Sequence, residues 1–414
     1  MQNKILFLNT YQDKGGAAKA AWNIFILLLE NNFSVKHLSL FGKDIKQTNN
    51  SRSLYKFNSI YYLIHLLKRS VIELYLKIRY PKKLKIKYSV SFSFGIQKII
   101  KHTWYSEADY IYLHWIEDGF IGFKELNKLF SSNKKIIWFL HDMEPFTGGC
   151  HHSLSCNRFK QKCGNCIVLG SNKKDLSSKI SIKKQNIFKK RNDIKIIGAS
   201  DWIIMKVKQS YLFRSYQTTK IPLFVNTNIF KQKDRHEIRN KFNFKVNKKY
   251  LCFGSIKSNK NVLKGGQLFL KALIKLSKTI NMKNIIIVLF GSSKYDTKYD
   301  KICEIINLGY INNNKQMSEL LNAVDVFISP SLAETFGQIV LESMLCGTPV
   351  IGFRNTALEN LIIHKKTGYL SKYENVDDLV NGIIYVLNNL TRIKYKNNNI
   401  DKKYILNEYN KIFL

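Results

Sequence analysis

Short apolar runs alternate with helical segments along the whole chain, and this alternation constrains the fold more than any other feature. The first cycle reads as a strand at 5–8, a glycine-containing loop at 13–18 and a helix that carries Ile24 and Leu28. Strand-like runs of the same kind follow at 35–40, 110–113, 136–140 and 194–199. Strands that alternate with helices predict parallel sheets with helices on both faces.

The cycle restarts after Pro222, with strands expected at 250–254, 285–291, 324–329 and 349–353. A chain of 414 residues is also too long for one ordinary core. We therefore expect an α/β protein with two doubly wound, Rossmann-like domains that face a central cleft. The expected parts are an N-terminal domain at 1–222, a C-terminal domain at 223–395, and a helix in 396–414 that packs back toward the N-terminal domain.

The chain is strongly basic, with 67 Lys and Arg against 29 Asp and Glu and a formal net charge of +38. Abundant Lys, Ile and Asn are typical of an AT-rich genome, so part of this charge reflects mutational bias. The basic residues are dispersed and no nucleic-acid reader motif is present, so we expect no nucleic-acid partner. Such a surface will still associate with anionic membranes at low salt.

Two further expectations concern location. The chain passes from Met1 directly into the strand at 5–8, without the apolar core and cleavage site of a signal peptide. No apolar run reaches the length of a membrane-spanning helix. We expect a cytoplasmic protein.

Residues 51–92 interrupt the alternation. Apolar residues keep helical spacing there, including Phe57, Tyr61, Ile64 and Leu74. Two interpretations stay open: a helix packed on its own domain with a solvated basic face, or an amphipathic surface that rests on a membrane. The densest basic run consists of Lys82, Lys83, Lys85 and Lys87.

The most specific motif runs from Ser329 to Val350, where a buried strand leads through a loop into a helix that starts near Phe336. The loop amides of Phe336 and Gly337 would point at a ligand above the helix start, which favours a phosphate site. Glu334 lies in the loop and Glu342 eight residues later in the helix. Carboxylates at these places can accept hydrogen bonds from sugar hydroxyl groups. A bare pair of acids at this spacing would indicate only an ordinary strand–loop–helix, but Gly337, with Gly347 and Pro349 later in the motif, favours a ligand site.

This stretch resembles the Glu-x7-Glu signature of the family 4 glycosyltransferases, also called group 1. Lys264-Gly265 looks like that family's diphosphate motif, and Gly15-Gly16-Ala17 looks like its opening glycine loop. The similarity is greatest to a subgroup that serves exopolysaccharides of the colanic-acid type, seen in Leu113-His114-Trp115 and in the run from His141 to His151.

The resemblance implies a GT-B fold and a retaining, hexosyltransferase-type enzyme that needs no catalytic metal. It places Lys264 and the amides of Phe336 and Gly337 at the leaving diphosphate, Glu334 at the sugar ring, and Glu342 at the ribose. His141 would touch the donor sugar from the other domain. The implied catalytic residues are His141, Lys264 and Glu334, and the implied donor-binding residues are Gly15, Gly16, Gly254, Tyr310, Thr335, Phe336, Gly337 and Glu342.

The resemblance also implies partners: a nucleotide sugar, a glycan or polyprenyl-linked acceptor, and the anionic inner face of the cytoplasmic membrane. The sequence departs from the family at Leu263 and Ser255, where many relatives carry Arg. Lys257 or Lys260 could assist Lys264 instead. The alternatives are another GT-B activity, namely a sugar phosphorylase or a nucleotide-sugar epimerase, or a basic polyanion-binding protein.

Four cysteines cluster in the loop at 147–168, and the last two form a Cys-x2-Cys pair. In a chain without an export signal such thiols suggest a structural zinc site rather than disulfides. The alternative is a loop of buried or redox-labile thiols. The predicted ligands are Cys150, Cys156, Cys163 and Cys166, with His151 or His152 as a replacement for one of them.

Overall fold

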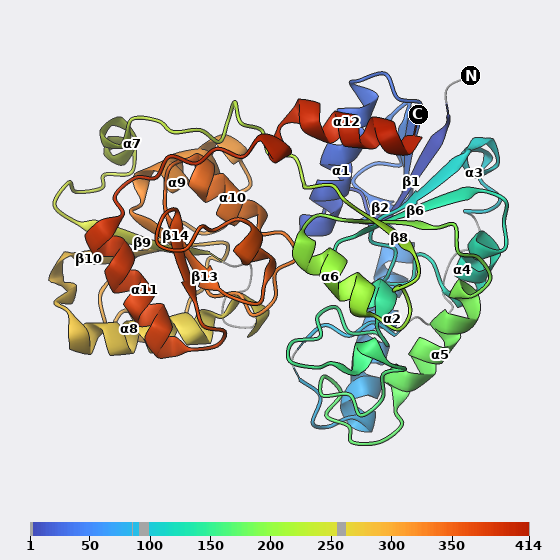
Figure 1. Ribbon diagram of the computed structural model, residues 1–414, viewed down its shortest axis with the longest axis horizontal. Helices are drawn as coiled ribbons and strands as arrows, with labels where there is room; N and C mark the ends of the chain where they lie inside the picture. The colour runs from blue at the N-terminus through green and yellow to red at the C-terminus, as the bar shows by residue number, and fades with distance from the viewer. Residues whose placement is uncertain (1–2, 85, 91–98, 255–261, 414) are drawn as a thin grey trace. The chain divides into compact units, whose positions relative to one another are not determined.

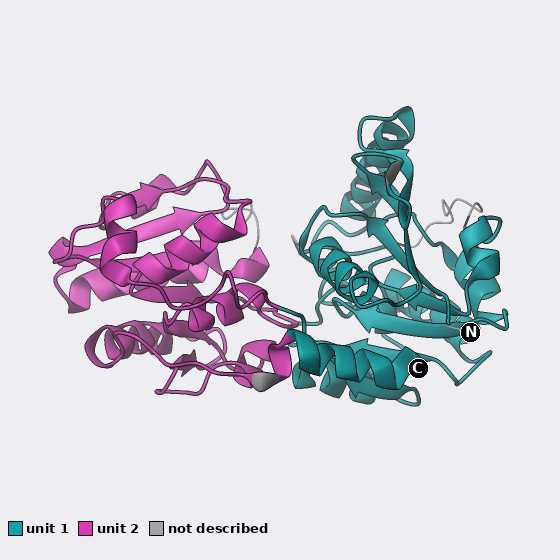
Figure 2. Ribbon diagram, turned by 90° about the horizontal axis from the view of Figure 1, so that it is seen from above, with its two compact units in different colours: residues 1–224, 402–414 teal, residues 225–401 magenta. Residues whose placement is uncertain are grey.

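The chain forms two compact units, each built around its own sheet (Figure 1, Figure 2). The computed structural model describes residues 3–84, 86–90, 99–254 and 262–413. The first unit comprises Met1–Phe224 and Lys402–Leu414, and the second comprises Val225–Asp401. The expected boundary at 222 thus differs by two residues from the one observed.

The sheet of the first unit has the strand order β3-β4-β2-β1-β5-β6-β7-β8. Its neighbouring strands run parallel, except for the antiparallel pair β3–β4. The strand order reverses direction between β1 and β5, so the loops after these two strands leave from a topological switch point. The strands are β1 Ile5–Tyr11, β2 Val35–Gly42, β3 Lys46–Thr48, β4 Ser51–Lys56, β5 Tyr110–Leu113, β6 Lys135–Leu140, β7 Lys195–Gly198 and β8 Gln217–Lys220.

The helices of the first unit bury apolar faces against this sheet. One core joins the side chains of Trp138, Phe188 and Phe213, which are at most 3% exposed. Each fully buried side chain of this size contributes about 1.5–3 kcal/mol. The helices are α1 Gly16–Leu29, α2 Ile60–Arg79, α3 Thr103–Glu107, α4 Phe123–Phe130, α5 Leu176–Phe188, α6 Asp201–Gln209 and α12 Lys402–Phe413.

The second unit has a fully parallel sheet with the order β11-β10-β9-β12-β13-β14. This is the Rossmann order, and its switch point lies between β9 and β12. The strands are β9 Lys249–Gly254, β10 Ile285–Phe290, β11 Glu304–Asn307, β12 Val326–Ser329, β13 Val350–Phe353 and β14 Gly368–Ser371. The helices are α7 Arg235–Lys241, α8 Gly266–Thr279, α9 Asn314–Ala323, α10 Gln338–Leu345 and α11 Val376–Asn389.

Helix α12 returns the end of the chain to the first unit, where it packs beside α1 (Figure 1). The hydroxyl groups of Tyr409 and Tyr112 lie 3.0 Å apart, and Asn3 donates a hydrogen bond to the carbonyl oxygen of Phe413. The observed helix begins at Lys402, later than the start of the predicted segment 396–414.

Residues 51–92 do not form one continuous helical insertion. Residues 51–56 form strand β4, which pairs in parallel with β2, because Ser51, Ser53 and Tyr55 alternate inward. Helix α2 begins after Ser59, whose side chain accepts a hydrogen bond from the N–H of Tyr62. In the described ranges no helix combines the length and the hydropathy needed to span a membrane.

A buried ion pair ties the segment after β6 to helix α5. The ammonium of Lys184 lies 2.8 Å from Oε1 of Glu144 and donates to the carbonyl oxygen of Thr147 at 3.1 Å. The two charged side chains are 3% and 5% exposed. Removing one partner of such a pair leaves an uncompensated buried charge, which costs about 3–5 kcal/mol.

We therefore expect Lys184→Met to lower the free energy of unfolding by about 3–5 kcal/mol, measured by urea denaturation. The double variant Lys184→Met/Glu144→Leu should recover part of this loss, because neither charge then remains buried. Lys179→Met, on the exposed face of α5, is the control and should change little. An equally small effect of Lys184→Met would contradict the structural role of the pair.

Candidate functional site

Two loops of the second unit leave adjacent strands at the switch point. The loop after β9 leads to the short helix η3 at Val262–Lys264, and the loop after β12 leads to α10. Ligands of open parallel sheets bind at the carboxyl ends of the strands beside such a point. The two loops therefore mark the candidate site of this unit.

The structure brings the two principal residues of these loops into direct contact. Nζ of Lys264 lies 2.7 Å from Oε2 of Glu334. Their side chains are 37% and 17% exposed, so both remain accessible to a ligand. The sequence predicted each residue separately, and the ion pair shows that one ligand could touch both.

Gly265 makes this contact feasible. It adopts φ +71°, and a Cβ at this position would lie 1.8 Å from the carbonyl oxygen of Pro330. The two loops are also joined by a hydrogen bond from the N–H of Leu332 to the carbonyl oxygen of Leu263 at 2.8 Å. Only glycine permits this close approach, so Gly265 positions Lys264 beside the second loop.

The same loop ends at the N-terminus of α10. Gly337 is the N-cap with φ +86° and has no side chain to cap the first-turn N–H groups. Uncapped N–H groups and the positive end of the helix dipole together favour an anion. Lys264 adds a cation in the adjoining loop, so the site suits a phosphate group beside a hydrogen-bonding carboxylate.

The other predicted donor-binding residues of the second unit lie on α10, in the loop before it, or after β11. Glu342 is buried in α10, and its Oε1 accepts a hydrogen bond from Gln338 at 3.0 Å. Tyr310 follows the edge strand β11 and is 57% exposed. Thr335 and Phe336 stand directly before Gly337, with the Phe336 ring buried.

Gly254 has a packing role in the structure, because a Cβ there would lie 2.0 Å from the Phe290 ring. Lys257, Lys260 and Ser255 lie outside the described residues.

The first unit also places its predicted residues at a switch point. Gly15 and Gly16 follow β1, and Gly15 is the N-cap of α1 with φ +97°. A Cβ at either glycine would meet nothing within 4 Å, so the backbone there faces open space. This exposed helix N-terminus could contact an anion.

His141 follows β6 and pairs with His114, which follows β5. Nε2 of His141 lies 3.0 Å from Nδ1 of His114. Burial lowers the pKa of His141 from 6.5 to about 4, despite the nearby charge of Asp142. At neutral pH the ring is therefore uncharged and can donate or accept a hydrogen bond with a sugar hydroxyl group.

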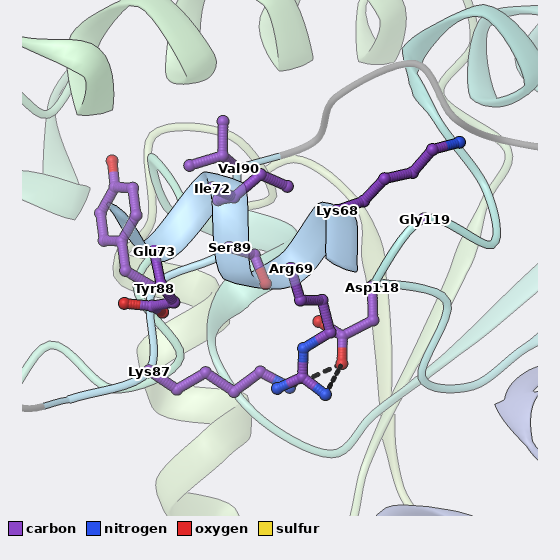
Figure 3. Close-up of a pocket in the computed structure, with 10 residues that line it drawn as sticks. All are labelled: Lys68, Arg69, Ile72, Glu73, Lys87, Tyr88, Ser89, Val90, Asp118 and Gly119. Carbon is purple, nitrogen blue, oxygen red and sulfur yellow. Dashed lines mark hydrogen bonds and ion pairs between the residues drawn. The ribbon is translucent and has the colours of Figure 1, made fainter. Parts of the chain in front are cut away.

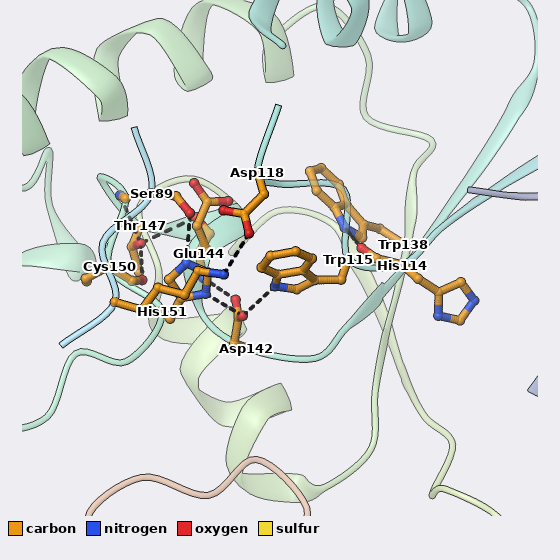
Figure 4. Close-up of polar contacts among 12 residues, drawn as sticks. Ser89, His114, Trp115, Asp118, Trp138, Asp142, Glu144, Thr147, Cys150 and His151 are labelled. Carbon is orange, nitrogen blue, oxygen red and sulfur yellow. Dashed lines mark hydrogen bonds and ion pairs between the residues drawn. The ribbon is translucent and has the colours of Figure 1, made fainter. Parts of the chain in front are cut away.

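Asp142 is the center of a buried polar network (Figure 4). Trp115 and His151 both point at this carboxylate, with Nε1 of Trp115 and Nδ1 of His151 at 3.0 and 2.6 Å from Oδ2. Burial would raise the pKa of Asp142, but the contact with His151 holds it well below its ordinary value. Nε2 of His151 in turn lies 2.8 Å from Oγ of Ser89.

This network was not predicted from the sequence. His151 was expected to end the motif that starts at His141, or to replace a zinc ligand, and Ser89 was not expected to have a role. The spacing of Asp142 and His151 inside one motif was a usable signal. Ser89 lies far away in the sequence, and only the fold brings it to His151.

The predicted zinc site is not formed. Within the described part of the chain, no group of three or more His, Cys, Asp and Glu side chains could hold a metal ion. The four cysteines are free, and burial raises the pKa of Cys163 to about 12, with a further increase from Cys166 and Cys156. Burial likewise raises the pKa of Cys150 and Cys166. Cys156 instead accepts a hydrogen bond from the N–H of Arg158 at 3.5 Å.

Comparison with known families gives a match in the second unit. Residues 234–403 match the family model "Glycosyl transferases group 1". This range contains both switch-point loops, including the Lys264–Glu334 pair and α10. The match covers less than half of the chain.

Curated relatives carry the same kind of name. An uncharacterized glycosyltransferase of Methanocaldococcus jannaschii is 28% identical over 146 residues, which cover 34% of this chain and 36% of the relative. The alpha-monoglucosyldiacylglycerol synthase of Streptococcus pneumoniae is 33% identical over 141 residues, or 28% of this chain and 31% of the synthase. This chain covers 36% of the length of the Methanocaldococcus jannaschii relative, and 40% of the length of an uncharacterized glycosyltransferase of Haemophilus influenzae.

Solved structures match over the whole chain. A sucrose-phosphate synthase from Thermosynechococcus elongatus has a TM-score of 0.61 at 14% identity and covers 100% of this chain and 99% of its own. HepE from Anabaena, in complex with UDP and glucose, has a TM-score of 0.58 at 15% identity and covers 99% of both chains. At this identity the likeness shows the fold alone, which is the predicted GT-B fold.

The lowered pKa of His141 gives a testable pH dependence. Its ring should stay neutral from pH 8 down to about pH 5, whereas an ordinary histidine titrates near 6.5. Because the unfolded chain takes up this proton first, the contribution to stability is full above about pH 6.5 and falls toward pH 4. NMR titration of the His141 ring, assigned with His141→Ala, measures this. A midpoint near 6.5 would contradict the buried pair with His114.

Proposed function

We propose that the chain is a retaining glycosyltransferase. It moves a hexosyl group from a nucleotide-sugar donor to a lipid-linked or oligosaccharide acceptor in the synthesis of bacterial capsule, exopolysaccharide or O-antigen. The observation that carries the proposal is the contact of Lys264 with Glu334 beside the uncapped N-terminus of α10. The group 1 family match over residues 234–403 supports it.

The site supports the chemistry of the donor. When the bond between the anomeric carbon and the diphosphate oxygen breaks, negative charge grows on the β-phosphate. Lys264 and the first-turn amides of α10 stabilise that charge electrostatically. The acceptor hydroxyl attacks from the face that the diphosphate leaves, and its proton passes to the leaving phosphate. No dedicated protein base is needed.

Two carboxylates of the second unit, and His141 and the Gly15–Gly16 loop of the first unit, are proposed as further contacts of the donor. Glu334 accepts hydrogen bonds from the sugar hydroxyl groups, and Glu342 binds the ribose. His141, neutral at pH 7, contacts the donor sugar, and the Gly15–Gly16 loop approaches the donor phosphates. The HepE structures, solved with UDP and with UDP-glucose, support a nucleotide-sugar donor by analogy of fold.

Lys264→Ala tests this assignment. It should lower kcat for sugar transfer by about 2–4 kcal/mol of barrier, on the order of 30- to 1000-fold, because it removes a cation from the leaving group. Transfer or donor hydrolysis is measured with a panel of nucleotide sugars. Lys271→Ala, at an exposed position on the following helix α8, is the control. Near-normal turnover of Lys264→Ala would remove Lys264 from the reaction.

We also propose that the first unit docks on an anionic membrane through the outer face of α2. This face is an apolar stripe in which Leu67, Val71, Leu74 and Ile78 are 57–73% exposed. They recur at i, i+4, i+7 and i+11, so they lie on one side of the helix. Lys77, Arg79 and Lys82 are exposed beside the stripe, and their charge is complementary to anionic lipid headgroups.

The structure changes which lysines this docking would use. Lys83 turns inward: its side chain is 9% exposed and its ammonium donates to the carbonyl oxygen of Ile86 at 3.2 Å. Lys87 contacts Asp118, and Lys85 lies outside the described residues. The charges available to a membrane are therefore those at the end of α2, together with Lys82.

Vesicle co-sedimentation tests this surface. The triple variant Lys77→Gln/Arg79→Gln/Lys82→Gln should weaken binding to anionic vesicles on the order of 100-fold, at about 1 kcal/mol per charge. Leu67→Gln/Val71→Gln should also reduce binding, because it shortens the apolar stripe. The control variant replaces three exposed lysines elsewhere on the unit: Lys124, Lys128 and Lys208. Equal binding to neutral vesicles, or equal loss in the control, would contradict the docking surface.

A further inference from the structure

A pocket in the first unit lies between α2 and two segments remote from it in sequence (Figure 3). Helix α2 contributes Lys68, Arg69, Ile72 and Glu73. The opposite wall comes from residues 87–90 and from Asp118 and Gly119, in the loop after β5. None of these residues was assigned a role in the donor site.

Three cations line this pocket against two carboxylates. Arg69 and Lys87 converge on Asp118, at 3.6 and 3.3 Å from its Oδ2, and Lys68 extends away from this group (Figure 3). The second acid, Glu73, lies 3.5 Å from the ammonium of Lys83. Among the charged residues that line the pocket, the three cations thus outnumber the two carboxylates. The pocket therefore carries net positive charge.

Asp118 orients the two cations without using all their donors. A guanidinium has five N–H donors and an ammonium three, more than one carboxylate oxygen can accept. The side chains of Arg69 and Lys87 are 46% and 40% exposed, whereas that of Asp118 is 11% exposed. Lys87 also lies over the Trp115 ring, 3.9 Å from its centroid. The cations are thus held in place and remain accessible to an anion.

Ser89 supplies a hydroxyl group at the wall of the pocket. Its Oγ contacts His151, which is held by Asp142 through the network described above. The contacts run from a serine hydroxyl group to a histidine and from this histidine to an aspartate, which is the order found in the catalytic triad of a serine hydrolase. However, the N–H of Ser89 donates to the carbonyl oxygen of Gly149 at 2.7 Å, so this amide is not available to stabilise an oxyanion. The arrangement suits an oriented hydrogen-bonding group in a binding site.

We infer that this pocket binds the diphosphate group of the acceptor, with Arg69 and Lys87 as its charge partners and Ser89 as a polar contact. The inference rests on the proposed function and narrows its lipid-linked acceptor to one in which a diphosphate joins the lipid to the glycan. Helix α2 then serves both parts of such a molecule. Lys68, Arg69 and Ile72 face the pocket, while the neighbouring Leu67 and Val71 belong to the exposed apolar stripe.

Isothermal titration calorimetry on the full chain tests the pocket. The probes are inorganic pyrophosphate, farnesyl diphosphate below its micelle concentration, and UDP. Arg69→Gln and Lys87→Gln should each weaken pyrophosphate and farnesyl diphosphate binding roughly 10- to 100-fold, as expected for a charge-assisted hydrogen bond. Lys124→Gln is the charge control and should bind both probes like the wild type. Thermal denaturation checks that each variant is folded, and Lys87→Arg should retain binding.

Binding of UDP at the donor site provides a second comparison, which separates the pocket from the proposed donor site. UDP binding should depend on Lys264 and be insensitive to Arg69→Gln and Lys87→Gln, whereas farnesyl diphosphate binding should show the opposite pattern. If UDP binding did not depend on Lys264 but farnesyl diphosphate binding still depended on Arg69 and Lys87, the result would count against the donor site and would still support the pocket. Tighter binding of farnesyl diphosphate than of pyrophosphate would identify the lipid as a contributor. Farnesyl diphosphate binding that survives both Gln variants would place the probe on the apolar stripe and overturn the inference.

Discussion

The reversal of strand order in each sheet is the constraint on which both candidate sites depend. In the second unit, successive crossovers pass to opposite faces on either side of β9 and β12, so their loops emerge together at one edge. The first unit repeats this geometry between β1 and β5. Residues far apart in the sequence, such as Lys264 and Glu334, meet because two neighbouring strands end at the same edge.

The ion pair at this edge has a consequence for ligand binding. In the absence of donor, Glu334 neutralises Lys264, so neither charge stands alone beside the helix N-terminus. In the proposed reaction, a donor diphosphate would offer Lys264 a second negative partner, and the sugar hydroxyl groups would donate hydrogen bonds to Glu334. In the pocket of the first unit, Asp118 likewise neutralises part of the charge of Arg69 and Lys87 in the absence of a ligand, and it orients both side chains for the proposed anion.

The sequence was sufficient for the architecture and for the linear motifs. The periodicity of apolar residues, together with the turn residues, predicted the parallel strands. Gly265 and Gly337 stand in the motif loops and adopt positive φ there. It was insufficient where a role depends on tertiary contacts. The apolar spacing in 51–56 also suited a strand, and pairing with β2 decided the outcome. Cysteine spacing suggested zinc, but among the described residues the fold brings no three of the candidate ligands together as a metal-binding group. Ser89 and Asp118 carry no local signal at all.

The Lys264–Glu334 pair and the N-terminus of α10 support the proposal that a nucleoside diphosphate binds at the switch point of the second unit. Amide hydrogen exchange with and without UDP, GDP, ADP or dTDP measures this directly, because bound phosphate protects the amides that it contacts. We expect one of these ligands to slow exchange at residues 264–266 and 335–338, with no comparable change at 86–90. Protection elsewhere in the chain, with unchanged exchange in these two segments, would contradict it.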